Sequence, residues 1–419
     1  MQVWNILQGP LNMRRSPSPL NWFLILGLVY LLMVAVGVLS QGFRTVSGGA
    51  DGAEAIFEFA TNPLVSVLLG VLATALVQSS SAVTSVIVGL VGGGLPIAIA
   101  IPMIMGSNMG TTITNTLAAL GNVREDEAFN RSFAAATVHD FFNLFTILIF
   151  LPLELLLHPL EHLSRWMTSW FYGSSDVSVG KYDFIRWLSR PAINGISDGI
   201  RRLPTGIAGA VMIMVGITMV LLAVYLLNQV LHSVMTGRAE QIFRAAIGKN
   251  SALALLSGLV VTLIVQSSTL TTVLIVPLAG AGIMTLAQVY PFTLGANIGT
   301  PITALMSATA ITGEYQAVAL QIAFVHLLYN ALAVGLFALI PPLWRLPLQA
   351  AQALANGATR SRLVVPAYIL GVFFVVPGIV FTGQSLFNNK SAAVIEAEKK
   401  DARYPPLQRE VEQKEIELE

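Results

Sequence analysis

The chain has 419 residues, of which 55% are hydrophobic and 11% charged, and its formal net charge is +1. This composition lies outside the range of soluble domains and indicates an integral membrane protein. The near-neutral charge excludes the basic surface of a nucleic-acid binder, and the absence of cysteine excludes disulfides, thiolate metal sites and a cysteine nucleophile.

The predicted membrane segments begin after a polar N-terminal tail, residues 1–21. Arg14 and Arg15 in this tail place it in the cytoplasm under the positive-inside rule. The apolar run from Trp22 to about Leu39 is long enough to span once, and its length and the lack of an A-x-A end favour a retained helix over a cleaved signal sequence. Further predicted spans cover roughly 133–157, 206–231, 315–341 and 363–385.

Two long tracts, 59–123 and 250–313, contain no Asp, Glu, Lys or Arg. Because about 20 apolar residues cross a bilayer, tracts of this length with internal Gly, Pro, Ser and Asn must turn back within the membrane. Broken or re-entrant helices are therefore expected in both. The tail 386–419 is rich in charged residues and is expected to be solvated.

The hydrophilic stretch 159–205, predicted as an inter-repeat loop, separates two similar halves, residues 22–158 and 206–385. Three motifs occur in the same order in each half. The first half contains QSSS at 78–81, GSNMGTTIT at 106–114 and VHDFFN at 138–143, and the second contains QSST at 266–269, GANIGTPIT at 295–303 and VHLLYN at 325–330. Such paired, Gly-interrupted segments predict an all-α polytopic membrane protein of two inverted-topology repeats, with broken helices at a midplane site.

Ser, Thr, Asn and Gln dominate the first two motifs, which contain no Lys or Arg. Hydroxyl and amide groups donate hydrogen bonds to an oxyanion, and their oxygens coordinate a small hard cation. Interrupted helices also point half-helix N-termini at an anion. An anion buried without a cationic side chain is balanced best by co-bound cations, which predicts coupling to a cation, although helix dipoles alone could suffice.

Four ionisable side chains lie within the third motif or close to it. Asp140 is inside a long apolar run, where carboxylates are usually functional; the alternative is an Asp that caps or hydrogen-bonds a neighbouring helix. On a helix Asp140 and Asn143 lie at i and i+3, close enough to share one cation. His139 and His326 fit packing residues better than ligands, and Glu154 is expected at the membrane interface.

At these motifs the sequence resembles the type II sodium-dependent phosphate cotransporter family, over roughly residues 60–345. QSSSAVTSVIV, FAAATVHDFFN, QSSTLTTVLIV and YPFTLGANIGTPITA read like members of that family and stand in its order. The resemblance implies sodium-coupled import of inorganic phosphate by alternating access. It also implies that the substrate-binding residues are Gln78, Ser79, Ser80, Asn108, Thr111, Gln266, Ser267, Ser268, Asn297 and Thr300.

The resemblance further implies a set of sodium ligands, and no cofactor besides the coupling sodium ions. These ligands are Thr116, Asn122, Glu125, Asn143, Gln266, Ser267 and Thr303, with Asp140 as the candidate for an additional site. Glu125 stands where the family usually has Asp, and Asn122 where it usually has Gln. Members with Asp in VHDFFN move net charge, whereas electroneutral members carry Gly, so electrogenic transport is expected.

The loop 159–205 lacks cysteine and an N-x-S/T acceptor, whereas animal members carry a larger, disulfide-bonded and glycosylated loop here. A bacterial inner membrane is therefore the expected location. The remaining alternatives are a sodium-coupled carrier of another small anion and an anion channel. An enzyme is not expected, because the sequence shows no convergent set of catalytic residues. The expected partners are phosphate, sodium and the lipid bilayer, with the oligomeric state left open.

Overall fold

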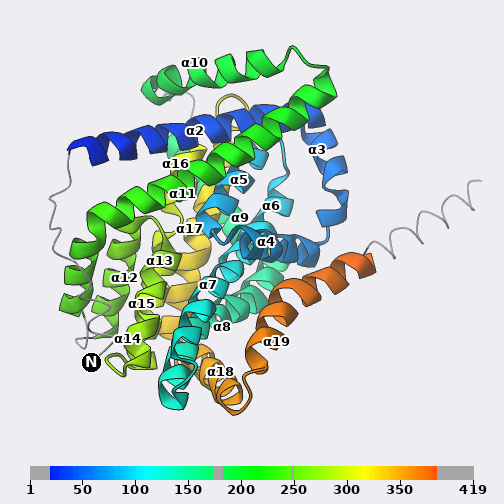
Figure 1. The fold of residues 1–419 in the computed structure, drawn as a ribbon. Coiled ribbons are helices and arrows are strands. Elements are labelled where there is room, and N and C mark those ends of the chain that lie inside the picture. The colour runs from blue at the N-terminus through cyan, green and yellow to red at the C-terminus, as the bar shows by residue number, and fades with distance from the viewer. Residues whose placement is uncertain (1–18, 173–182, 247–249, 385–419) are drawn as a thin grey trace, which may run out of the picture.

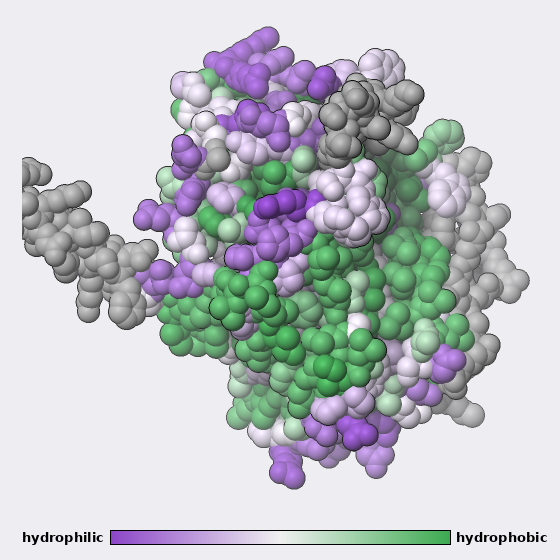
Figure 2. All heavy atoms as spheres, turned by 180° about the vertical axis from the view of Figure 1, so that it is seen from behind, coloured by the Kyte–Doolittle hydropathy of each residue, from purple (hydrophilic) through white to green (hydrophobic). Residues whose placement is uncertain are grey.

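The computed structural model describes residues 19–172, 183–246 and 250–384, and every element within these ranges is a helix (Figure 1). Six of the described helical stretches are long and apolar enough to cross a membrane: 20–47, 97–122, 126–157, 205–231, 316–339 and 364–384. Figure 2 shows hydrophobic side chains across the middle of one face, with hydrophilic ones toward two opposite ends. The predicted all-helical membrane architecture is confirmed. Most of the predicted N-terminal tail and the whole charged C-terminal tail lie outside the described residues.

The first half is built from long helices at its two ends and short ones between them. Its elements are α2 (Pro19–Ser47), α3 (Ala50–Ile56), η1 (Glu58–Ala60), α4 (Pro63–Val77), α5 (Ser80–Gly92), α6 (Ile97–Met109), η2 (Gly110–Thr112), α7 (Ile113–Ala119), η3 (Leu120–Asn122) and α8 (Asp126–Leu157). The charge-free tract thus forms several short helices, as its length and its Gly and Ser content predicted.

The second half repeats this pattern. Its elements are α11 (Thr205–Ala246), α12 (Ser251–Val265), α13 (Ser268–Val273), α14 (Val276–Gly280), α15 (Leu286–Gly299), α16 (Ile302–Ala308), α17 (Gln316–Leu339), α18 (Pro341–Arg360) and α19 (Val364–Leu370), which continues into a π-helical turn (Gly371–Val375). The long helices α2 and α11 pack against each other and run across one face of the shorter helices (Figure 1).

The stretch 159–205, predicted as a hydrophilic inter-repeat loop, contains two helices. α9 (Pro159–Tyr172) and α10 (Asp183–Ile200) are amphipathic, so their overall polarity concealed a helical period. Glu154, near the end of α8, is buried and accepts hydrogen bonds from the backbone N–H groups of Leu160 at 2.7 Å and Glu161 at 3.0 Å. Its carboxylate therefore stabilises the start of α9.

The helix pairs of one half recur in the other. Within the halves, α4 packs on α6 as α12 packs on α15; between them, α9 packs on α17 as α18 packs on α8. Contacts between the halves are also reciprocal, since α5 touches α16 while α13 and α14 touch α7. The helix contacts of the two halves therefore have an approximate two-fold symmetry.

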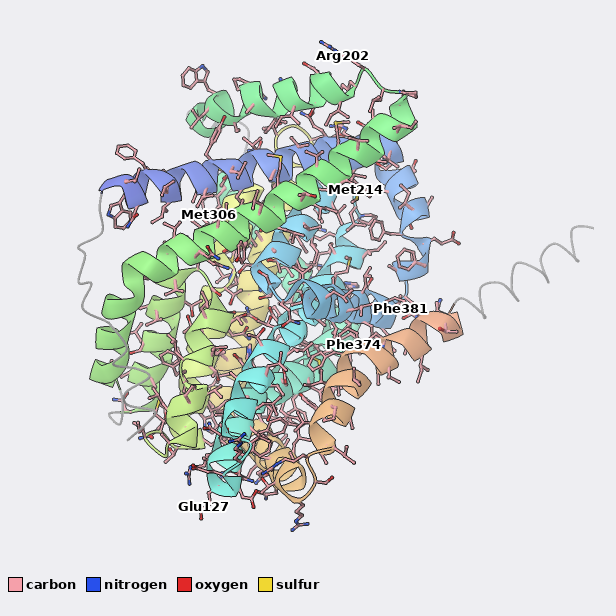
Figure 3. The ribbon with its side chains drawn as sticks, in the orientation of Figure 1. Glu127, Arg202, Met214, Met306, Phe374 and Phe381 are labelled. Carbon is pink, nitrogen blue, oxygen red and sulfur yellow. The ribbon has the colours of Figure 1, made fainter. Side chains whose placement is uncertain are left out.

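The broken helices of the two halves return toward opposite ends of the molecule. Gly92, which ends α5, lines a small cavity together with Arg201, whereas the carbonyl oxygen of Gly280, which ends α14, accepts a hydrogen bond from Arg131 at 3.0 Å. Figure 3 shows Arg202 and Glu127, near neighbours of these two arginines in the chain, at opposite ends. This geometry agrees with the inverted arrangement, which stays a prediction together with its orientation in a bilayer.

Candidate functional site

Each QSS motif lies where one short helix ends and the next begins. Gln78 ends α4 with a φ of 59°, and Gln266 ends α12 with a φ of 55°. These left-handed conformations stop both helices, a role that Gly usually fills. Ser79 and Ser267 then cap the following helices, accepting hydrogen bonds from backbone N–H groups three residues ahead at 3.3 and 3.2 Å. The same residue types therefore build the same break twice.

Both breaks face one cavity of about 910 Å³. The first repeat contributes Ser79–Ser81 with Gln78 and Thr114, and the second contributes Ser267–Thr269. Among the described residues that line this cavity, none is charged. The structure therefore brings together five of the predicted substrate residues: Gln78, Ser79, Ser80, Ser267 and Ser268.

The electrostatics of this cavity come from hydroxyl groups and from helix ends. The first N–H groups of a helix have no acceptor within it, so those of Ser80 and Ser81 in α5 lack a helical partner. The same holds for Ser268 and Thr269 at the start of α13. Together with the positive end of the helix dipole, these groups can bind an oxyanion without a cationic side chain.

The two glutamines of the breaks have different surroundings. Gln78 is fixed on both sides, since its Nε2 donates to the carbonyl oxygen of Ala75 and its Oε1 accepts from the Thr114 hydroxyl at 2.7 Å. Gln266 is outside the cavity lining, and its Nε2 contacts the sulfur of Met306 at 3.9 Å. Its Oε1 is buried without a hydrogen-bond partner in the described chain. That oxygen is available to a cation.

Four asparagines of the second and third motifs form a buried network between the repeats. The Nδ2 of Asn108 donates to the Oδ1 of Asn330 at 2.6 Å, and the Nδ2 of Asn297 donates to the Oδ1 of Asn143 at 3.1 Å. In return, Asn143 donates to the backbone oxygen of Asn108 at 3.1 Å, and Asn330 to that of Asn297 at 2.8 Å. The predicted ligands Asn108, Asn143 and Asn297 thus join the repeats and do not line the cavity.

The two histidines contact this network. The Nε2 of His326 lies 3.0 Å from the Oδ1 of Asn108, and the Nε2 of His139 lies 3.2 Å from the Nδ2 of Asn143. Each ring is buried, and each Nδ1 lacks a partner within the described residues. These contacts agree with the packing role that the sequence favoured.

Asp140 is buried in α8, and its Oδ2 accepts a hydrogen bond from the Tyr368 hydroxyl at 2.7 Å. Its Oδ1 has no partner in the described chain. Asn143, expected to share a cation with Asp140, accepts a hydrogen bond from the Nδ2 of Asn297 at its amide oxygen. The two side chains therefore have different partners in this structure.

The other predicted ligands lie away from the cavity wall. Four threonines are buried in or beside the short helices: Thr111, Thr116, Thr300 and Thr303. The hydroxyl of Thr300 donates to the carbonyl oxygen of Ala296 at 3.1 Å, whereas those of Thr111 and Thr303 lack partners in the part of the chain that is described. Asn122 and Glu125 lie at the turn before α8, where Asn122 is partly buried and Glu125 is exposed.

Some residues of the site were missed by the sequence analysis. α11 brings Tyr225, Asn228 and Gln229 to the cavity, and Thr114 reaches it from α7. The available signal was a pair of adjacent amides inside the apolar run 206–231, because polar residues within a membrane span usually face a cavity or a partner helix. For Tyr368 no comparable signal exists, since one tyrosine in an apolar run is ordinary.

Comparison with known proteins finds a matching family model and several relatives. A family model described as Na+/Pi-cotransporter matches residues 31–164 and 219–341. Sodium-dependent phosphate transport protein 2A is 30% identical in Rattus norvegicus, covering 85% of this chain and 67% of the relative, and 30% identical in Oryctolagus cuniculus, covering 88% and 68%. Sodium-dependent phosphate transport protein 2B of Pongo abelii is 29% identical over 85% of this chain, which spans 64% of that relative's length. No solved structure matches the chain significantly.

Proposed function

The chain belongs to the Na+/Pi-cotransporter family, and on that premise we propose that it imports inorganic phosphate together with sodium ions. The observation that carries the proposal is the single cavity to which both QSS motifs contribute. Relatives of both types, 2A and 2B, are named as sodium-dependent phosphate transport proteins. The chain spans 64% of the 2B relative, so the complete activity is part of the proposal.

Phosphate binding is supported by the chemistry of the cavity wall. Phosphate presents several acceptor oxygens, and the helix starts at Ser80 and Ser268 supply N–H and O–H donors from both repeats. At about 910 Å³ the cavity is comparable in size to small-molecule sites, which leaves room for the ion and part of its hydration shell. Because the described lining has no charged group, the negative charge of the anion must be balanced by positive charge from outside that lining.

Sodium ions are proposed as that balance, with no further cofactor. Buried oxygens without partners in the described chain support the proposal: Gln266 Oε1, Thr303 Oγ1 and Asp140 Oδ1. Carboxylate, amide and hydroxyl oxygens are ligands for hard cations. Leaving such a group unpaired costs about 1–3 kcal/mol, which a bound ion would offset. Asp140 is proposed to serve an additional ion and so to make transport electrogenic.

Alternating access is the proposed mechanism, because two halves with approximately symmetric helix contacts can open a shared site to each side of the membrane in turn. The proposed location is a bacterial inner membrane with the N-terminus in the cytoplasm. Arg14 and Arg15 support that orientation, and the absence of cysteine and of an N-x-S/T acceptor in 159–205 supports the bacterial source.

The test is uptake of labelled phosphate into proteoliposomes, with a sodium, potassium or proton gradient as the only driving force. Saturable uptake driven by sodium alone is expected. Uptake at full rate without sodium would overturn the coupling, and non-saturable flux would indicate a channel. Competition with sulfate, arsenate and small carboxylates separates a phosphate carrier from a sodium-coupled carrier of another small anion.

A further inference from the structure

Helix α11 forms a wall of the cavity that neither QSS motif supplies. Its lining residues are Leu221, Val224, Tyr225, Asn228 and Gln229, whose spacing places them on one helix face. The face is apolar at its first two positions and polar at its last three. α2, the corresponding helix of the first half, contributes no residue to the described lining, so this wall breaks the symmetry of the repeats.

Two neutral amides on this face have no hydrogen-bond partner among the described residues. Asn228 is partly buried and Gln229 is exposed, and neither side chain forms a hydrogen bond with any other described residue. Amides in membrane helices normally bond a neighbouring helix or face a polar cavity, because lipid offers them no partner. Since both residues line the cavity, their N–H and C=O groups are available to its contents.

We propose that Asn228 and Gln229 recognise the transported oxyanion from α11, which completes a site that the two serine motifs leave open on this side. This inference rests on the proposed function. A tetrahedral oxyanion presents oxygens in several directions, and each amide offers two N–H donors. A third helix can therefore reach oxygens that the starts of α5 and α13 do not. Neutral donors also leave the charge balance to the coupling ions.

The first experiment measures phosphate uptake by Asn228→Leu and Gln229→Leu in proteoliposomes. Each substitution keeps an unbranched Cβ and removes the amide. The KM for phosphate should rise about tenfold for the loss of one hydrogen bond to a charged group, while the sodium dependence at saturating phosphate stays unchanged. Thr218→Val is the matched control on α11, because the Thr218 hydroxyl bonds the carbonyl oxygen of Met214 at 2.8 Å and does not line the cavity.

An unchanged KM in both leucine variants would overturn the inference. A wild-type protein that takes up no phosphate would sink the proposed function instead, so the two failures are distinct. An equal rise in the Thr218→Val control would assign the effect to α11 as a whole and also overturn the specific role of the amides.

A second measurement uses the absence of cysteine from the chain. Asn228→Cys, Gln229→Cys and Thr218→Cys are modified with a charged methanethiosulfonate in the full-length protein, with and without phosphate plus sodium. Phosphate should slow modification at 228 and 229 and leave 218 unchanged. Equal rates with and without phosphate at 228 and 229 would place these side chains away from the ion and contradict the inference.

Discussion

The hydroxyl of Tyr368 donates a hydrogen bond of 2.7 Å to the Oδ2 of Asp140, so a helix of the second half holds the buried carboxylate of the first. Tyr368 lies outside the ranges that match the family model. The other carboxylate oxygen, Oδ1, has no partner in the described chain. A carboxylate within a membrane is costly, and a hydroxyl donor and a cation would each reduce that cost.

Replacing Asp140 should separate transport from its electrical response. In Asp140→Gly, sodium-driven phosphate uptake should remain measurable but lose its dependence on membrane potential, because the additional ion site loses its carboxylate. The measurement is uptake in proteoliposomes with an imposed potential. Undiminished voltage dependence would remove Asp140 from the ion path, and loss of folded protein would favour a structural role.

Tyr368→Phe should lower thermal stability through the Asp140 contact. The substitution removes the hydroxyl and keeps the ring, which stacks on Phe141 at 6.4 Å between centroids. A hydrogen bond to a charged group contributes about 1.5–3 kcal/mol, so the melting temperature in detergent should fall by several degrees. In the Asp140→Gly background the same change should cost much less. Equal costs in both backgrounds would show that the Tyr368 hydroxyl stabilises something else.

Asn143 and Asn330 offer a matched pair, because they hold equivalent positions in the asparagine network. Asn143→Ala and Asn330→Ala should destabilise the protein similarly, by about 1–3 kcal/mol for the polar groups left unpaired. Only Asn143→Ala should also raise the sodium concentration needed for half-maximal uptake, since of the two only Asn143 belongs to the sodium ligands that the family resemblance implies. An equal sodium shift in both variants would assign the effect to the network alone.

The helix breaks could be predicted from the sequence because their causes are local. A charge-free tract too long for one span must turn, and the duplicated QSS motifs mark where. The structure confirms the breaks. Each has a left-handed residue, Gln78 or Gln266, followed by a helix cap at Ser79 or Ser267. The cavity between the motifs follows from the same duplication.

The partners of the asparagines could not be predicted, because they depend on packing between helices far apart in the chain. The resemblance implied that Asn108 binds the substrate, and the motifs showed Asn330 only as the last residue of VHLLYN. The structure has them bonded to each other at 2.6 Å. Overall polarity likewise concealed the helical period of α9 and α10, which only an amphipathicity analysis would have shown.

Bulky residues at the two helix starts should block phosphate entry. Ser80 and Ser268 are buried beside the cavity, so Ser80→Leu or Ser268→Leu fills space at the proposed anion site and should abolish uptake. Ser169→Leu, at an exposed position of α9, is the control and should transport normally. Because overpacking costs about 1–3 kcal/mol, gel filtration must show that each variant is folded. A folded leucine variant with the wild-type KM would remove that serine from the site.

Glu127 and Arg202 should be reachable from opposite sides of the membrane. Both are exposed, they lie at opposite ends of the molecule (Figure 3), and the one candidate span between them in the described chain is 126–157. With the N-terminus in the cytoplasm, α2 crosses to the outside. The α4–α5 hairpin enters the membrane from the outside and returns there, and the segment from α6 to η3 then crosses back to the cytoplasm. Glu127 should therefore face the cytoplasm and Arg202 the outside.

In this cysteine-free chain, Glu127→Cys and Arg202→Cys each provide a single thiol. An impermeant maleimide added to intact cells should modify Arg202→Cys at once, and Glu127→Cys only after permeabilisation. Modification of both thiols from outside would contradict a single crossing by α8. The second half could then not begin on the opposite side of the membrane from the first, as inverted repeats require. The reverse pattern would keep that crossing but contradict the orientation that Arg14 and Arg15 predict, because the N-terminus would then lie outside.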